Sequence, residues 1–554
     1  MLVTYFYHYL AIRQIYRKNP YSDVGYTIIS FTKESVRLCH FVIITILKTT
    51  TYSKNYLWPF YDRLYINIRL GCKDYIYTGT VYGNAVSNSF TMVTIYFDTH
   101  VFSHLYKCQE EKFQILRRKI LEHKDEFIFL YSDAHLQDLY NDPTETKFQE
   151  LEFMKEIVDE YHITYNAPIL HVDVETPYNR FQSIKPIEDT SWIDEIDPNN
   201  LSDEQIISLR NSMDIIAKDL NGELAPEWPF TRVPLGKSGE PFDKESMKAM
   251  MNFVNDNHFG ANGQYKRIRD VASALYNPKQ IHVDNNEDLN KITKETLLGV
   301  SFDEILTALS KQFGLTSPDN SQTYLLHYYF LDNWGLCPEK RKTVKARNLL
   351  IDSAHSYLAS YCDCLVSDDK GMRTKSEVLY KRYGIDTAIY TIDEFIEKFD
   401  EAIANNQKSV SEYIFETIED HTKSETIKID KYEGHTFTHI KPHHSYFGYF
   451  NQMIEAYSEN DWGIMLGKRN GLNQSILLRE IEIIVNRISK VFANIGFEYQ
   501  PFQFETESEQ LKEDNWIGRA WRCPNFIIRL EKLKGYANLC LIISPLAEQS
   551  AQTA

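Results

Sequence analysis

The chain has 554 residues, enough for two to four domains, and its 43% hydrophobic content excludes a disordered polypeptide. The formal net charge of −17 excludes a polycation that binds nucleic acid over its whole surface. The eight cysteines include no CxxC pair, and no apolar run approaches the length of a membrane span. These features predict a cytoplasmic protein with reduced thiols and no membrane association.

Residues 1–91 differ in charge from the rest of the chain. They carry ten Lys and Arg against four Asp and Glu, whereas residues 92–554 carry 50 against 73. Two interpretations are open: a basic, aromatic nucleic-acid-binding arm, or an over-extended gene start before the methionine at position 92. The second interpretation predicts that this N-terminal extension is dispensable.

Residues 92–165 alternate between strand and helix patterns. The β-branched run MVTIYFDTHVF is typical of a buried strand and carries Asp98. A second apolar run, EFIFLYS, ends at Ser132, which is placed to cap the next helix, and that helix carries Asp138. A further helix is predicted over residues 148–163 from its spacing of apolar residues.

Residues 166–321 interrupt this pattern and predict an all-helical insertion. A helix is expected over residues 202–220, and another begins at a capping box formed by Ser301 and Glu304. Without secondary structure, a loop of this length would be implausible, so a subdomain is the better interpretation.

The sheet pattern returns in residues 322–400. One helix carries Asp352 and His355 a turn apart, and the apolar run CDCLV then leads into SDD. A basic helix, the short strand TAIYT and a capping box of Thr391 and Glu394 follow. Because the carboxyl ends of parallel strands meet at one edge of a sheet, we expect the carboxylates to gather there. The polar residues of SDD are Ser367, Asp368 and Asp369.

These motifs resemble those of the PIN-like nuclease family, over residues 92–165 and 322–400. That family has an aspartate after its first strand, an acid in the helix after its second strand, a D-x-x-[HI] helix and a T-x-D strand end. His100 stands where the family has Asn, and Ser367 stands where it has Thr, so a polar side chain remains at both positions. The matching residues are Asp98, Asp138, Asp352 with His355, and Asp369.

The resemblance implies an α/β fold with a parallel-sheet PIN-like domain, and a metal-dependent ribonuclease, toxin-like or defence-related. Grouped carboxylates repel unless a cation neutralises them, and oxygen ligands suit Mg²⁺ or Mn²⁺. The alternative is a catalytically inactive PIN-like scaffold that binds RNA or a protein partner such as an antitoxin. The implied metal-binding and catalytic residues are Asp98, Asp138, Asp352 and Asp369, and the supporting residues are Ser132, His355, Ser367 and Asp368.

Basic residues flank the predicted acidic site. They form either a groove for the phosphate backbone of RNA or an ordinary solvated face. The residues concerned are Lys340, Arg341, Lys345, Arg347, Arg373 and Lys375.

The C-terminal part of the chain predicts a polar helical connector over residues 401–424 and a smaller α+β module over residues 425–554. The module includes a helix of about 20 residues and two final strands around a Lys534–Gly535 hairpin signal. Its sequence indicates no function.

Overall fold

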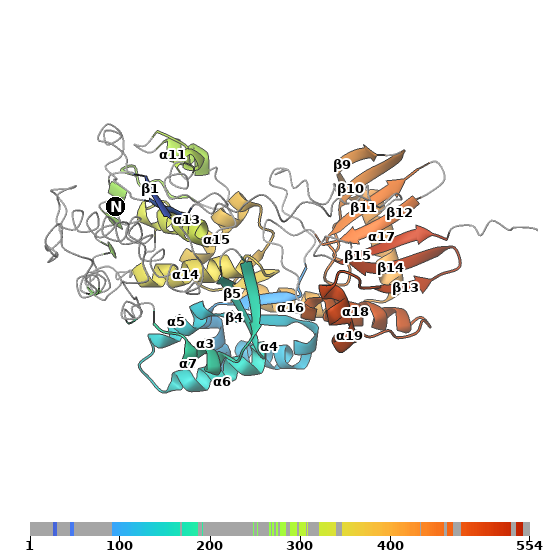
Figure 1. Ribbon diagram of the computed structural model, residues 1–554, viewed down its shortest axis with the longest axis horizontal. Helices are drawn as coiled ribbons and strands as arrows, with labels where there is room; N and C mark the ends of the chain where they lie inside the picture. Colours follow the sequence, from blue (N-terminus) through green and yellow to red (C-terminus); the bar gives the residue numbers. More distant parts are fainter. Residues whose placement is uncertain are drawn as a thin grey trace, which may run out of the picture. The chain divides into compact units, whose positions relative to one another are not determined.

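The computed structural model describes residues 91–166, 169–186, 321–338, 346–432, 434–458, 462–468, 478–532 and 539–546, two short strands at 26–29 and 45–48, and scattered residues between 191 and 307. The chain divides into two compact units, whose helices and strands are labelled in Figure 1. The first unit comprises residues 1–62, 183–357 and 374–379, and the second comprises residues 63–182, 358–373 and 380–554. The predicted helix at 202–220 and most of the N-terminal extension lie outside the described residues.

The second unit contains a six-stranded sheet in the order β6-β5-β4-β3-β7-β8. All neighbouring strands run parallel except β5 and β6, which are antiparallel. This mixed, mostly parallel sheet confirms the predicted α/β class. The strands are β3 (Thr94–Phe97), β4 (Ile128–Ser132), β5 (Tyr161–Asn166), β6 (Ile169–Val174), β7 (Cys364–Val366) and β8 (Ala388–Tyr390).

Strand β3 is the centre of this sheet. Ile95 pairs with Phe129 of β4 on one side and with Cys364 of β7 on the other. Every residue of β3, β4 and β7 is buried, which explains their unbroken apolar sequences. Along the chain, β4 and β5 are added on one side of β3, and β7 and β8 are added later on its other side. Strand order therefore reverses between β3 and β7, the position where open α/β sheets bind ligands.

Helices follow the strands of this sheet. The aromatic rings of Phe395 and Phe399 on α16 pack against Phe97 and Phe129 of the sheet. The helices of the α/β region are α3 (Thr99–Lys107), α4 (Glu111–His123), α5 (Asp133–Tyr140), α6 (Thr146–Val158), α7 (Pro177–Ser183), α15 (Lys370–Tyr383) and α16 (Ile392–Asn406). The predicted Thr391–Glu394 capping box is present at the start of α16.

Two element predictions are wrong at their ends. The run from position 92 does not continue as a strand beyond Phe97, because helix α3 begins at Thr99. The helix predicted over 148–163 ends at Val158, since Asp159 adopts a positive φ of 51° that stops it. Residues 161–166 then pair with β4, and β6 lies inside the insertion that was predicted to be all-helical.

In the first unit, the described helices include α11 (Leu289–Lys294) and α13 (Ser321–Asn333). The predicted capping box is observed: the Ser301 amide donates to Glu304 Oε2 at 2.7 Å, and the Glu304 amide donates to Ser301 Oγ at 3.2 Å. On α13, the buried Asp332 accepts a hydrogen bond of 2.7 Å from the Tyr265 hydroxyl.

The C-terminal part of the second unit forms a seven-stranded antiparallel sheet in the order β13-β14-β15-β12-β11-β10-β9. Helix α18 buries Ile481, Ile484 and Ile488 along one face. Strands β14 and β15 pair antiparallel, and the predicted hairpin signal Lys534–Gly535 lies outside the described residues. The elements are α17 (Val410–Lys423), β9 (Glu425–Tyr432), β10 (His435–Lys441), β11 (Gln452–Tyr457), β12 (Trp462–Gly467), α18 (Leu478–Ala493), α19 (Phe504–Lys512), β13 (Arg519–Arg522), β14 (Phe526–Lys532) and β15 (Leu539–Pro545).

A largely buried lysine joins the two sheets of the second unit. Lys468, just after β12, has its Nζ 2.8 Å from Asp363 and 2.7 Å from Glu480. Asp363 in turn accepts hydrogen bonds from the backbone amides of Val93 and Thr94, at 2.8 and 3.0 Å. Burial alone would lower the pKa of Lys468, but the two carboxylates raise it above its usual range. Burial would likewise raise the pKa of Asp363, but Lys468 and the two amides lower it.

We predict that Lys468→Met destabilises the protein by about 3–5 kcal/mol at neutral pH, because it leaves two buried carboxylates without a cation. In the parent, the lowered pKa of Asp363 gives a contribution to stability that is present above the unfolded pKa and lost as pH falls through the folded pKa. In the variant, burial raises the carboxyl pKa values above their unfolded values, so stability falls as pH rises. The difference in unfolding free energy between parent and variant should therefore become smaller as the pH falls toward about 4.

Urea unfolding of parent and variant across this pH range measures the deficit. Lys398→Met is the matched control, since Lys398 lies 2.7 Å from Glu401 on the exposed surface and its loss should cost less than about 1 kcal/mol. A pH-independent deficit in Lys468→Met would contradict the assigned charge state of the triad.

Candidate metal centre

The site begins with Asp98, at the carboxyl end of β3. Its side chain is buried, and although it occupies the N-cap position of α3 it makes no side-chain cap bond. Instead, Asp98 Oδ2 accepts a hydrogen bond of 2.7 Å from the hydroxyl of Ser367, which follows β7. The Asp98 amide also donates to Val366 O at 3.0 Å. These two hydrogen bonds connect the carboxyl ends of β3 and β7, the strands between which strand order reverses. Ser367 also orients the Asp98 carboxylate.

Helix α5 brings the second carboxylate to this edge. Thr99 Oγ1 donates to Asp138 Oδ2 at 2.8 Å, which joins the start of α3 to α5. Ser132, a predicted supporting residue, acts as the N-cap of α5 by accepting from the Ala134 amide at 3.2 Å. The observed role of Ser132 is therefore to fix the helix that carries Asp138.

Sequence reasoning missed His135, which is fully buried on α5. Its Nδ1 accepts from the Ser132 amide at 3.0 Å, so its Nε2 carries the proton and donates to Phe97 O at 2.6 Å. The ring is therefore neutral, and it holds the last residue of β3 against α5. The signal in the sequence is S-x-x-H, where histidine takes the place of the glutamate in a capping box.

Three side chains form a group that could hold a metal ion: Asp98, Asp138 and His355. One ligand atom from each lies within 4.8 Å of the other two. Asp98 and His355 are buried and Asp138 is partly exposed. His355 lies on α14 (Ala346–Ala359), one turn before the end of that helix. Among the described residues, neither Asp352 nor Asp369 belongs to this group.

The paired aspartates after β7 have a different set of contacts. Asp369 is the N-cap of α15, where its Oδ1 accepts from the Met372 amide at 3.0 Å. The exposed Asp368 accepts from the Ile392 amide at 3.0 Å, at the start of α16. These are the contacts of helix caps, and the predicted role of Asp369 as a metal ligand stays a prediction.

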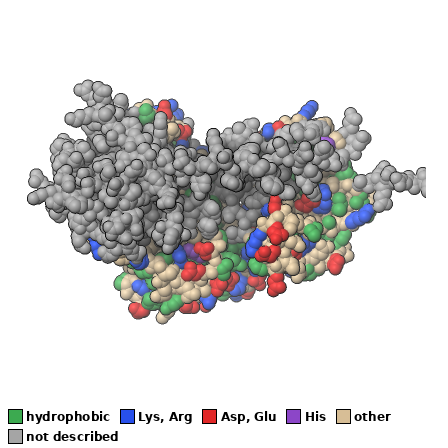
Figure 2. All heavy atoms as spheres, viewed as in Figure 1, with side chains coloured by type: hydrophobic (Ala, Val, Ile, Leu, Met, Phe, Trp, Pro, Cys, Tyr) green, Lys and Arg blue, Asp and Glu red, His purple; other side chains and the backbone are tan. Residues whose placement is uncertain are grey.

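Two of the residues predicted to contact a phosphate backbone are in the interior. Lys375 is completely buried, with its Nζ 3.6 Å from Asp332 and 5.2 Å from the centre of the Tyr328 ring, and Arg347 is also buried. The predicted groove is therefore wrong for Lys375 and Arg347, because a buried cation cannot line an open surface. Arg373 is partly buried on α15, and the other three residues, Lys340, Arg341 and Lys345, lie outside the described residues. On the face seen in Figure 2, acidic and basic side chains of the described surface are interspersed.

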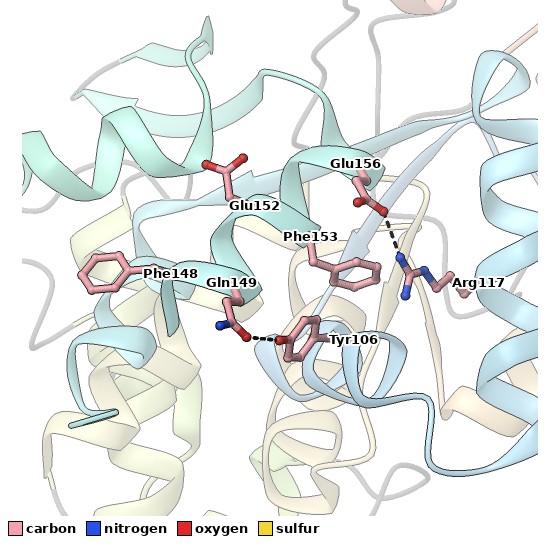
Figure 3. Close-up of a pocket in the computed structure, with 7 residues that line it drawn as sticks. All are labelled: Tyr106, Arg117, Phe148, Gln149, Glu152, Phe153 and Glu156. Atoms are coloured by element: carbon pink, nitrogen blue, oxygen red, sulfur yellow. Dashed lines mark hydrogen bonds and ion pairs between the residues drawn. The ribbon is translucent and has the colours of Figure 1, made fainter. Parts of the chain in front are cut away.

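A separate groove of about 430 Å³ lies on helices α3, α4 and α6 (Figure 3). Tyr106 donates a hydrogen bond of 2.6 Å to Gln149, and Arg117 pairs with Glu156 at 3.0 Å while stacking over the Phe153 ring. These four polar groups are thus engaged with one another, and the aromatic rings of Tyr106, Phe148 and Phe153 also line the groove. The remaining lining residue is Glu152. This groove contains none of the residues of the candidate metal centre.

No protein-family model, curated protein or solved structure matches this chain. The resemblance to PIN-like nucleases therefore stays a prediction that rests on the motifs themselves. None of the helices in the described ranges combines the length and the apolar character that a membrane crossing requires.

The cap contacts of Asp369 give a direct test of its role. Asn caps helices as well as Asp does, so Asp369→Asn should keep the stability of the parent, whereas Asp369→Ala should lose about 1 kcal/mol. Thermal or urea unfolding measures both values. If Asp369 instead ligates a metal, Asp369→Asn will weaken the stabilisation of the protein by Mn²⁺, and the cap will not be its main role.

Proposed function

We propose that the chain is a PIN-like, divalent-metal-dependent endoribonuclease whose metal ligands are Asp98, Asp138 and His355. The observation that carries the proposal is the approach of these three side chains to within 4.8 Å beside the point where strand order reverses. Neighbouring hydrogen bonds support it, because Ser367 and Thr99 fix one oxygen of each carboxylate. Orientation of ligands by such outer contacts is a general property of metal sites.

The donor set indicates which ions fit. Two carboxylates and one imidazole suit Mn²⁺ better than Mg²⁺, since Mg²⁺ prefers oxygen ligands in a strict octahedron. Oxygen and nitrogen ligands lie about 2.0–2.2 Å from a transition-metal ion, so two ligands of one ion are at most about 4.4 Å apart. The observed limit of 4.8 Å is close to this value, and small side-chain rotations are enough to close the set.

Asp98, Asp138 and His355 would hold the divalent ion, which would supply an activated water and offset the charge that develops on a phosphodiester. The chain itself supplies the positions of the ligands. His135 is neutral and fixes the end of β3, so it holds Asp98 in place without adding charge. RNA as substrate comes from the family resemblance, together with the need for a phosphodiester at such a site.

A second function has one observation in its favour. The group contains two carboxylates where the PIN-like pattern has four acids, and Asp369 caps α15. A site with fewer acids binds cations more weakly, which favours a scaffold that binds RNA or a protein partner without cleaving it.

The test has two readouts on the full-length chain. The first is the shift in melting temperature on adding Mn²⁺ or Mg²⁺ to protein treated with chelator, and a ligand at 100 times its Kd should add about 2.7 kcal/mol of stability. The second is cleavage of single-stranded RNA. Asp98→Asn, Asp138→Asn and His355→Gln should each lose most of the metal-induced shift, and cleavage should fall by about a hundredfold or more. Asp125→Asn is the matched control, because Asp125 is largely exposed in the same unit.

The outcomes separate the alternatives. A metal-induced shift that the three variants lose, with cleavage by parent and control, supports the nuclease. A shift without cleavage in any metal supports the inactive scaffold. If no divalent ion raises the melting temperature of the parent, the metal site itself is wrong.

A further inference from the structure

Strand β9 forms an open edge of the antiparallel sheet (Figure 1). Within the part of the chain that the structure describes, β9 pairs with β10 on one side and with no strand on the other. Two of its apolar side chains are exposed, Ile427 at 42% and Ile429 at 59%. A strand edge with unpaired backbone groups and exposed apolar side chains is a template for pairing with another chain.

The neighbouring helix α17 adds to this apolar surface. Its residues Ile414, Phe415 and Ile418 are all more than half exposed. Its His421 contacts Glu455 of β11, and Glu455 stands in the same cross-strand row as Thr438 and Ile429. Helix α17 therefore packs on the face of the sheet that carries Ile429. Large exposed apolar patches of this kind mark interaction surfaces.

The sequence of β9 is complementary to itself in one antiparallel register. In a continuous sheet, residues that lie opposite each other on neighbouring strands point to the same face. When two copies of β9 pair about a two-fold axis perpendicular to the sheet, one residue of β9 therefore lies opposite its own copy, and the axis passes between those two copies. An axis at Lys428 would set two ammonium groups opposite each other, and one at Asp430 would set two carboxylates opposite. Within one chain, Lys428 Nζ already lies 2.8 Å from Asp430 Oδ2. An axis at Ile429 sets Ile429 against its own copy and places each Lys428–Asp430 pair beside the partner's pair in reversed order, so that Lys428 also faces the partner's Asp430.

The other apolar residue of β9 does not offer an equivalent register. His439 of β10 pairs with Lys428 and Ile440 pairs with Thr426, so Ile427 is an extra residue in a β-bulge. An axis at Ile427 would fall on this bulge, where the ladder is interrupted. The axis at Ile429 instead lies within the regular stretch from Lys428 to the end of β9.

We propose that two copies of the chain associate through β9, antiparallel about a two-fold axis at Ile429, so that their seven-stranded sheets become one. The unpaired backbone groups of the edge give the association its affinity, and the two Lys428–Asp430 pairs give its register. The apolar side chains of α17 lie on the same face as the contact. The proposal does not depend on the metal centre.

A pair of cysteine variants tests the register. Opposite residues in an antiparallel pair have Cα atoms about 4.5–5.5 Å apart, which is within the range of a disulfide. Ile429→Cys should therefore form a dimer linked through residue 429 under mild oxidation. In the matched control Ile427→Cys, the two introduced cysteines are four residues out of register, about 13 Å apart, and should not link. The parent chain, with Cys108 and Cys523 partly exposed, sets the background.

Charge exchange tests the same contact without oxidation. Lys428→Asp alone should weaken the dimer, measured by sedimentation equilibrium, by about tenfold, since it sets carboxylates opposite each other. The double variant Lys428→Asp with Asp430→Lys should restore the parent affinity and retain the parent melting temperature. A parent that remains monomeric at every concentration overturns the proposal, and so does equal linking of the cysteines at 427 and 429. Association that the double variant does not restore would indicate a different surface.

Discussion

The contact between Lys468 and Asp363 positions strands β3 and β7, which carry the candidate metal centre at their carboxyl ends. Asp363 immediately precedes β7, and its carboxylate binds the amides of Val93 and Thr94 at the start of β3. The amino ends of the two strands are thus set at one level. Because both strands are short, their carboxyl ends also meet, and Asp98 reaches Ser367 at 2.7 Å. The buried ammonium of Lys468 keeps Asp363 ionised for this role, and it comes from a different sheet.

The contacts of Lys468 explain why the C-terminal module and the α/β sheet belong to one compact unit. Lys468 follows β12 and also contacts Glu480 of α18, so the module supplies both the cation and a second carboxylate to the base of the α/β sheet. Arg487 of α18 adds hydrogen bonds to the backbone oxygens of Phe447 and Glu126, which precedes β4. The contacts at the base of the α/β sheet are therefore structural, whereas the candidate centre lies at the opposite ends of the strands.

Local patterns in the sequence predicted much of the α/β region. The buried runs of β3, β4 and β7, the cap at Ser132 and the start of α16 at Thr391 all follow from neighbouring residues. The burial of Lys375 does not, because its partner Asp332 lies 43 positions earlier and no local pattern connects them. Strands β5 and β6 were missed for a similar reason. The pairing of β5 with β4, and of β6 with β5, overrides the helical spacing that precedes β5.

The choice between metal ligand and helix cap is the hardest part of the candidate centre to predict. Asp98 and Asp369 both follow a buried parallel strand by a few residues and both stand at the N-cap of the next helix. At that position a carboxylate has two competing partners, the helix amides and a cation at the edge of the sheet. Asp369 accepts from the Met372 amide, whereas Asp98 accepts from the Ser367 hydroxyl and lies beside Asp138 and His355. The contacts that distinguish Asp98 from Asp369 come from neighbours on other strands and helices, which the local sequence does not contain.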